Sequence, residues 1–269
     1  MLARLTVLAA LLIGTAQAQT QPAIRDLGPE AARSAIYVGN SFFYYNNSMH
    51  GHVSLMQRAA GMAAMRTTSI TISGAGWEWH DVASYFRPNA VGSYRFDARN
   101  NVVFNSNARL FDLAIMMDCS QCPIHPRLGP VFHDYARRHS ETVRAHGARP
   151  VFFMSWAYKD MPEMTAQLAE AYTVAGNAND ALVIPAGLAF ARSMAERPGL
   201  DLYVADLRHP SLAGTYLAAA TTYATLSGHS PVGNGYDAGL GAETAAFLQR
   251  MAWETVQGYF GAGRRAASN

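Results

Sequence analysis

The sequence predicts a three-layer α/β/α sandwich with a central parallel sheet, and two observations lead to this prediction. Short apolar runs recur along the chain, and they alternate with longer stretches of helical character. Continuous rather than alternating hydrophobicity is typical of strands that are buried on both faces. Strand–helix alternation then places helices on both sides of a parallel sheet, whose functional sites lie at the carboxyl ends of its strands.

Five segments are expected to form the strands of this sheet. Each is short and rich in apolar or β-branched residues, and Gly39, Gly74 and Pro185 stand just after three of them as stops. The expected strands are residues 36–38, 68–73, 113–117, 151–154 and 182–184.

Five longer segments are expected to form helices. The clearest begins near Leu128, has an apolar stripe on one face and stops at Gly147. Ser211 is a typical capping residue at the start of another. The expected helices are residues 48–60, 128–146, 161–175, 211–226 and 242–259. Residues 81–107, rich in Asn, Tyr and Arg, are expected to form an insertion with a hairpin over the site.

Composition favours one folded domain. Of 269 residues, 50% are hydrophobic and 15% are charged, which supplies enough apolar material for a sizeable core and argues against disorder. The net charge is +2, and basic residues do not cluster among aromatic ones, so no nucleic-acid partner is expected.

The first 18 residues have the three parts of a secretory signal peptide. Arg4 supplies a positive start, residues 5–13 are apolar, and Ala16-Gln17-Ala18 matches an A-x-A cleavage pattern. The apolar stretch is too short to span a membrane as a helix. We therefore expect residues 19–269 to form a single domain, located in the periplasm or secreted, with no integral membrane segment after cleavage.

The two cysteines, Cys119 and Cys122, stand three residues apart. An oxidising compartment favours a local disulfide between them, ahead of unmodified thiols and of a redox or metal role. A lone CxxC provides too few zinc ligands, so no metal site is expected.

Ser41 follows a predicted strand in the sequence Tyr37-Val38-Gly39-Asn40-Ser41. A Ser in that turn lies at the end of the sheet, close to the amides of a helix N-terminus, which favour developing negative charge. The same three residues, Gly-Asn-Ser, are also common in ordinary turns, where they only cap backbone amides.

Asp206 and His209 stand three residues apart, just before the helix that begins near Ser211. An Asp at this spacing can hold one imidazole nitrogen while the other faces a nucleophile. The alternative is a solvated turn in which Asp206 only caps amides. Because a Ser needs an adjacent base, the two motifs together predict a catalytic triad of Ser41, His209 and Asp206.

These motifs resemble those of the SGNH hydrolases, a branch of the GDSL esterases and lipases. Gly39-Asn40-Ser41 matches the first block of that family, and Asp206, His209 and Pro210 match its last block. The resemblance implies a flavodoxin-like SGNH hydrolase fold and a serine esterase that needs no cofactor.

The resemblance also implies an oxyanion hole. Its donors would be the backbone amides of Ser41 and Gly74, with Gly76 as the alternative to Gly74. The third block of the family normally supplies an Asn, and this chain has none there. Gln121 is assigned that role, with Ser120 as the other option.

Trp77 and Trp156 are expected to bind substrate, although both residues could equally be ordinary core aromatics. We expect a small-molecule or polysaccharide ester as substrate, with an O-acetylated carbohydrate first. An O-acyltransferase using the same triad and a non-catalytic glycan-binding protein are the alternatives. The sequence does not predict the oligomeric state.

Overall fold

The computed structural model describes residues 19–28, 30–88, 91, 94–104 and 109–261; the predicted signal peptide lies outside them. The five predicted strands form one sheet, in which all neighbouring strands are parallel and the order is β2-β1-β5-β6-β7. These strands are β1 (Ser34–Gly39), β2 (Arg66–Thr71), β5 (Leu113–Met116), β6 (Arg149–Phe153) and β7 (Leu182–Ile184).

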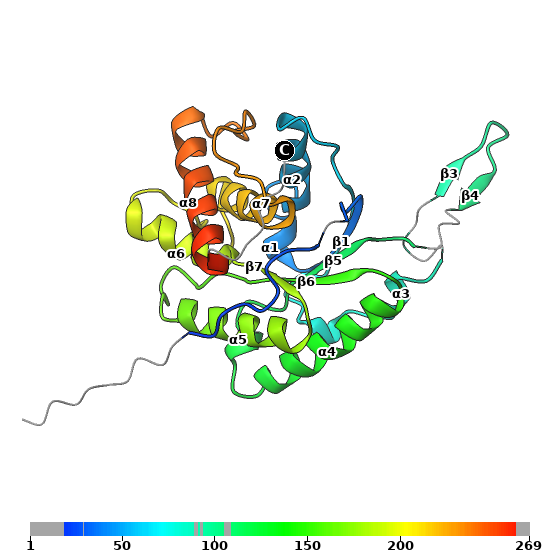
Figure 1. Ribbon diagram of the computed structural model, residues 1–269, viewed down its shortest axis with the longest axis horizontal. Helices are drawn as coiled ribbons and strands as arrows, with labels where there is room; N and C mark the ends of the chain where they lie inside the picture. Colours follow the sequence, from blue (N-terminus) through cyan, green and yellow to red (C-terminus); the bar gives the residue numbers. More distant parts are fainter. Residues whose placement is uncertain (1–18, 29, 89–90, 92–93, 105–108, 262–269) are drawn as a thin grey trace, which may run out of the picture.

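Helices cover both faces of the sheet, as predicted. The longer ones are α2 (Met49–Ala59), α4 (Gly129–Ala145), α5 (Met164–Ala178), α6 (Ala186–Glu196), α7 (Leu212–Ser227) and α8 (Ala242–Phe260). Short helical turns form α1 (Ser41–Tyr44), α3 (Val82–Tyr85), η1 (Trp77–Trp79) and η2 (Cys122–Ile124). Helices α4 and α5 lie below the sheet in Figure 1, and α2, α7 and α8 lie above it, which gives three layers. The sequence analysis did not predict α6.

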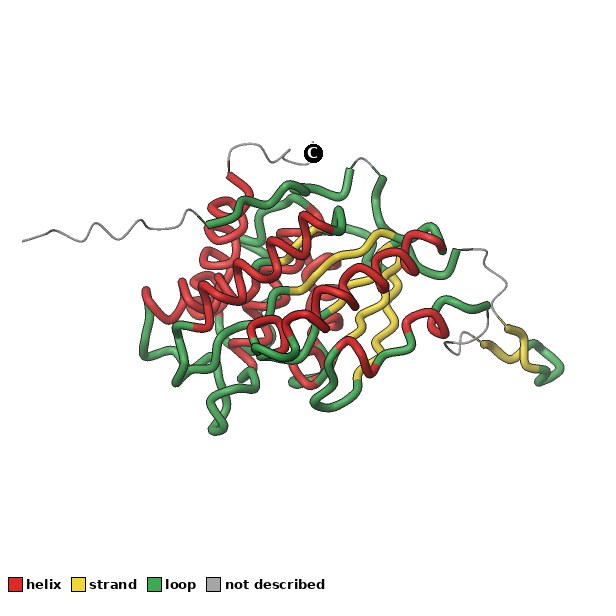
Figure 2. Tube along the Cα trace, turned by 90° about the horizontal axis from the view of Figure 1, so that it is seen from below, coloured by secondary structure: helices red, strands yellow, loops and turns green. Residues whose placement is uncertain are grey.

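Burial of the strands agrees with their continuous apolar sequences. Every residue of β1, β5 and β7 is buried, whereas β2, at the edge of the sheet, is only partly covered. Strand β6 is also buried apart from its first residue, so the core lies on both faces of the sheet away from β2. Figure 2, seen from below, shows the strands behind the helices of the lower layer.

Gly214 allows α7 to approach the segment that precedes it. A Cβ atom at Gly214 would lie 2.2 Å from the carbonyl oxygen of Leu202, which is backbone and cannot move aside cheaply. Tyr203 and Pro210 pair as an isolated antiparallel bridge, so the segment between them forms a tight loop against the start of α7. This loop contains Asp206 and His209.

The predicted insertion forms a hairpin of β3 (Tyr94–Phe96) and β4 (Val102–Phe104), but its predicted position is wrong. It projects from the body in both views (Figures 1 and 2). The chain leaves the body near Phe86 and returns near Phe111, and the rings of these two residues pack 5.5 Å apart. Phe111 precedes β5, so the hairpin is attached at the amino ends of the strands, opposite the edge where Ser41 follows β1.

Among the helices that the structure describes, none has both the length and the hydropathy needed to cross a bilayer.

Candidate active site

Ser41 is the first residue of α1, and only Asn40 separates it from the carboxyl end of β1. Asn40 caps this short helix: its side-chain oxygen accepts the N–H of Phe42 at 3.2 Å. The amide nitrogen of Asn40 donates to the carbonyl oxygens of Ala75 at 3.0 Å and Asp118 at 3.1 Å. One buried side chain thus joins the turn of Ser41 to the loops that follow β2 and β5.

Asp206 organises the turn that contains His209. One of its carboxylate oxygens accepts the backbone N–H groups of Arg208 and His209, each at 2.9 Å. The other oxygen lies 2.5 Å from Nδ1 of the His209 ring. Leu207 has a left-handed φ of 64°, which lets the chain reverse within this turn.

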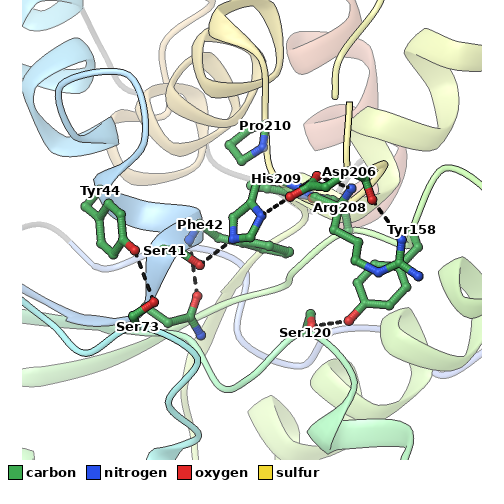
Figure 3. Close-up of polar contacts among 12 residues, drawn as sticks. Ser41, Phe42, Tyr44, Ser73, Ser120, Tyr158, Asp206, Arg208, His209 and Pro210 are labelled. Carbon is green, nitrogen blue, oxygen red and sulfur yellow. Dashed lines mark hydrogen bonds and ion pairs between the residues drawn. The ribbon is translucent and has the colours of Figure 1, made fainter. Parts of the chain in front are cut away.

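The structure brings Ser41, His209 and Asp206 together. Ser41 Oγ lies 2.7 Å from His209 Nε2, although 168 residues separate them in sequence. Figure 3 shows the His209 ring between the Ser41 hydroxyl and the Asp206 carboxylate. With its proton on Nδ1, the ring donates to Asp206 and presents a free Nε2 lone pair to Ser41.

The carboxyl of Asp206 is held in its ionised form. Partial burial acts to raise its pKa. Hydrogen bonds from the His209 ring and from the N–H groups of Arg208 and His209 outweigh this and lower the pKa to about 2. The negative charge of Asp206 therefore remains beside Nδ1 throughout the neutral range.

Aromatic side chains surround the His209 ring. Tyr45 stacks on it with centroids 4.5 Å apart and planes inclined by 11°, and Phe42 meets it edge-on at 5.6 Å. Both follow Ser41 in sequence, so the turn of the nucleophile also packs against the imidazole. Tyr45 was not predicted from the sequence, because an aromatic residue after a turn carries no distinctive signal.

The predictions that Trp77 and Trp156 bind substrate are wrong. Both side chains are fully buried. Trp77 stacks on Phe132 of α4 at 5.0 Å, within the layer below the sheet. Trp156 is sandwiched between Phe42 at 4.5 Å and Phe190 of α6 at 4.2 Å. Its indole N–H donates to the carbonyl oxygen of Arg208 at 3.0 Å, so Trp156 supports the triad from beneath.

Asn46 is a second residue that sequence reasoning missed. Its side-chain amide donates to the carbonyl oxygen of Pro210 at 3.0 Å and to Oγ1 of Thr215 at 2.8 Å. Its backbone has a left-handed φ of 54°, and its carbonyl oxygen lies 2.7 Å from Nε2 of His52. The pair Asn46-Asn47 was the available sequence signal, because Asn tolerates positive φ better than most residues, and the structure places both at positive φ.

The predicted oxyanion residues have different surroundings. Gly74 lies in the loop after β2 and has a left-handed φ of 72°. The Oγ of the preceding residue, Ser73, accepts a hydrogen bond from the Tyr44 hydroxyl at 3.2 Å. The role of Gly74, like that of the Ser41 amide, stays a prediction. The amide nitrogen of Gln121 lies 4.0 Å from Sδ of Met164, so this side chain is directed toward α5.

Asp118 is a buried carboxyl group in the loop after β5, with 1% of its surface exposed. One oxygen accepts the N–H groups of Trp77 at 2.8 Å and Cys119 at 2.7 Å. Burial is the main cause that raises its pKa to about 7, and the nearby charge of Glu78 also raises the pKa. The two N–H hydrogen bonds act to lower the pKa. Asp118 thus links the loop after β2 to the loop after β5 through a group that titrates near neutrality.

Cys119 and Cys122 form the disulfide that was favoured, with Cα atoms 5.2 Å apart. Ligand atoms of Asp118 and both cysteines lie close together, but the two sulfur atoms are bonded to each other. Neither is then a thiolate, which is the form that binds metals.

Three further side chains lie near the triad in Figure 3. The hydroxyls of Ser120 and Tyr158 are 2.6 Å apart. The guanidinium of Arg208 lies 4.3 Å from the centre of the Tyr158 ring, and it also forms an ion pair with Asp160 at 3.8 Å.

Sequence comparisons identify no relative: no protein-family description matches the chain, and neither does any curated protein. Solved structures do resemble it. A DUF4886 family protein from Bacteroides uniformis superposes with a TM-score of 0.61 at 16% identity, over 87% of this chain and 97% of that chain.

Two further structures carry a functional description. A candidate SGNH hydrolase from Slackia heliotrinireducens has a TM-score of 0.51 at 24% identity, over 72% of this chain and 98% of its own. A catalytic mutant of an acetylxylan esterase from Geobacillus stearothermophilus has a TM-score of 0.52 at 12% identity, over 73% and 95%. Together with the parallel five-stranded sheet, these likenesses show that the chain has the fold of the SGNH hydrolases.

Proposed function

We propose that this protein is an exported serine esterase that hydrolyses carboxylic esters by acyl transfer to Ser41. The observation that carries the proposal is the hydrogen-bonded series from Ser41 Oγ to His209 Nε2, and from His209 Nδ1 to Asp206. A Ser hydroxyl is a weak nucleophile unless a base accepts its proton, and this arrangement supplies that base.

In the proposed reaction, Ser41 Oγ attacks the ester carbonyl carbon while His209 Nε2 takes the hydroxyl proton. The tetrahedral intermediate collapses, and His209 returns the proton to the departing alcohol. Water then attacks the acyl-enzyme by the same route and releases the acid. Asp206, ionised and bonded to Nδ1, orients the ring and stabilises the imidazolium that forms in each half of the cycle.

An O-acetylated carbohydrate remains our first proposal for the substrate class. The likeness in fold to an acetylxylan esterase supports it. The two tryptophans no longer support it, because neither reaches the surface.

Turnover of p-nitrophenyl acetate and of acetylated xylan tests the proposal in wild type and in Ser41→Ala. Ser54→Ala is the matched control, because Ser54 lies on α2 and its hydroxyl donates to the carbonyl oxygen of His50 in the preceding turn. Wild type and the control are expected to turn over ester, and Ser41→Ala is expected to lose activity. A fluorophosphonate should label Ser41 alone. Equal turnover by wild type and Ser41→Ala, or no labelling of a folded wild type, would reject the esterase.

Export rests on the signal-peptide pattern of residues 1–18, and the Cys119–Cys122 disulfide supports it, because such bonds persist in oxidising compartments. A chain that begins at Gln19 keeps the bond from the Thr20 N–H to Glu170 at 3.0 Å. Mass spectrometry of the protein recovered outside the cytoplasm should find Gln19 at its N-terminus. An intact Met1 in that fraction would contradict cleavage.

A further inference from the structure

Acyl transfer at Ser41 needs hydrogen-bond donors for the negative charge that develops on the carbonyl oxygen. The loop after β5 is placed to provide one, because the Asn40 amide donates to the carbonyl oxygen of Asp118 and so holds this loop beside the nucleophile. The loop carries four polar residues, Asp118 to Gln121, and none of them is the Asn expected there.

Three of the four residues are committed elsewhere. The Asp118 carboxylate accepts two backbone N–H groups in the interior. Cys119 is bonded to Cys122 and has no S–H to donate. The Gln121 amide is directed at Met164.

Ser120 is different, because its hydroxyl is paired with a group that can act as donor to it. Ser120 Oγ lies 2.6 Å from the Tyr158 hydroxyl. The Arg208 guanidinium lies 4.3 Å from the centre of the Tyr158 ring. Its positive charge attracts the π-electrons of the ring, so the Tyr158 hydroxyl is a better hydrogen-bond donor than the Ser120 hydroxyl. When Tyr158 donates, the Ser120 hydrogen is left free for another acceptor.

Two connections tie the segments that carry this pair to the loops of the triad. Arg208 precedes His209 directly and holds the carbonyl oxygen of Asp206 with one guanidinium nitrogen at 2.8 Å. On the other side, the loop of Ser120 is fixed to Asn40, which precedes Ser41. Figure 3 shows Ser120 and Tyr158 across the Ser41–His209 pair from Tyr44 and Ser73.

We propose that Ser120 is the third-block oxyanion donor of this enzyme, and that Tyr158, under Arg208, orients and polarises its hydroxyl. This proposal rests on the esterase function. No proton is transferred in this step: Ser120 O–H donates to the carbonyl oxygen as it becomes negative, and Tyr158 O–H donates to Ser120 Oγ.

The test compares Ser120→Ala, Ser120→Asn and Tyr158→Phe with wild type on p-nitrophenyl acetate. Loss of a donor that acts in the transition state should lower kcat and leave KM nearly unchanged. We expect Ser120→Ala to lower kcat by about 100-fold, on the scale of other single oxyanion donors. Tyr158→Phe keeps the Ser120 hydroxyl and should lower kcat less. Ser120→Asn supplies an amide donor and should recover part of the loss.

The inhibition constant of phenylboronic acid provides a second measurement, which would not change if Ser120 had only a structural role. Its adduct with Ser41 resembles the tetrahedral intermediate, so its inhibition constant should rise in Ser120→Ala by a factor similar to the loss of kcat. Thermal unfolding and fluorophosphonate labelling confirm that each variant is folded with Ser41 reactive. Wild-type kcat in Ser120→Ala would overturn the proposal. Activity that survives Ser41→Ala would instead reject the esterase itself.

Discussion

The side-chain amide of Asn46 donates to the carbonyl oxygen of Pro210 at 3.0 Å. It thereby joins the chain just after Ser41 to the chain just after His209. The same amide donates to Thr215, so both of its N–H groups are used. Through this one side chain, the loop between α1 and α2 fixes the loop before α7, and the distance between hydroxyl and imidazole depends on both.

Asn46→Asp replaces this donor with a carboxylate that faces a carbonyl oxygen. We expect kcat for p-nitrophenyl acetate to fall by about tenfold or more with little change in KM, because small displacements of catalytic groups are costly. Asn46→Gly separates the causes, since it keeps the left-handed backbone at φ 54° but lacks the amide. It should also lower kcat. Wild-type activity in Asn46→Gly would show that only the backbone matters.

Asp206→Asn should keep the acceptor for the N–H groups of Arg208 and His209 but favour the wrong imidazole tautomer. In other triads this change costs on the order of 10,000-fold in kcat, and we expect a loss of that kind here, measured on folded protein. Because hydrogen bonding lowers the Asp206 pKa to about 2, its ionisation should cause no step in wild-type kcat/KM above about pH 4. Persistence of full activity in Asp206→Asn would contradict the role.

Asp118 should make the free energy of unfolding fall as pH rises from 4 to 7. A salt-bridged carboxylate, whose pKa is lowered, would have the opposite effect. The pKa of Asp118 is raised from 3.8 to about 7, so the folded state binds the proton more tightly than the unfolded state. The contribution of Asp118 is then largest below pH 4 and declines as pH rises to 7, by an amount on the order of 4 kcal/mol.

Asp118→Asn is the comparison that isolates this effect, because Asn keeps one acceptor and does not titrate. The free energy of unfolding of both proteins is measured in urea at several pH values. Between pH 4 and 7, the wild type should lose stability relative to Asp118→Asn. Above pH 8 the difference should be constant. A difference that is flat from pH 4 to 8 would mean that Asp118 stays ionised throughout.

Removal of the disulfide should affect activity more than stability. The bond spans only three residues, so loop closure accounts for about 2 kcal/mol or less. Ser120 lies between the two cysteines, however, and its position depends on that loop. The double variant Cys119→Ser with Cys122→Ser should remain folded by urea titration and lose kcat several-fold. Unchanged kcat would show that η2 and its contacts alone hold Ser120.

Trp77 and Trp79, which are separated by one residue, form a matched pair for testing the core. Trp77 is fully buried against Phe132, whereas Trp79 has 61% of its surface exposed. Trp77→Ala should lower the free energy of unfolding by about 3 to 5 kcal/mol, and Trp79→Ala by far less. Similar losses in the two variants would contradict this burial.

The features that sequence could predict are those with a local physical signature. Runs such as Leu113–Met116 are continuously apolar because both faces of an inner strand are buried, and they were placed correctly. The Asp206–His209 spacing could be interpreted because one short turn is enough to bring a carboxylate to an imidazole. The meeting of that turn with Ser41 required the fold.

The errors concern features whose outcome depends on distant packing. Trp77 and Trp156 have the same composition signal as surface aromatics, and only the positions of α4 and α6 decide that they are covered. Helix α6 was missed because Pro185 was interpreted only as the stop of β7. Pro185 is also the N-cap of α6, where a missing N–H costs nothing.

The hairpin of β3 and β4 leaves the body at Phe86 and returns at Phe111, whose rings touch. The two ends of the inserted segment therefore pack against each other at the amino ends of the strands, opposite the edge that carries the nucleophile. Additions at the hairpin are therefore expected to leave the packing of the body intact. A fluorescent tag or a tethering peptide grafted at the hairpin tip should leave ester turnover unchanged, which offers a way to immobilise the protein with its reactive edge facing outward.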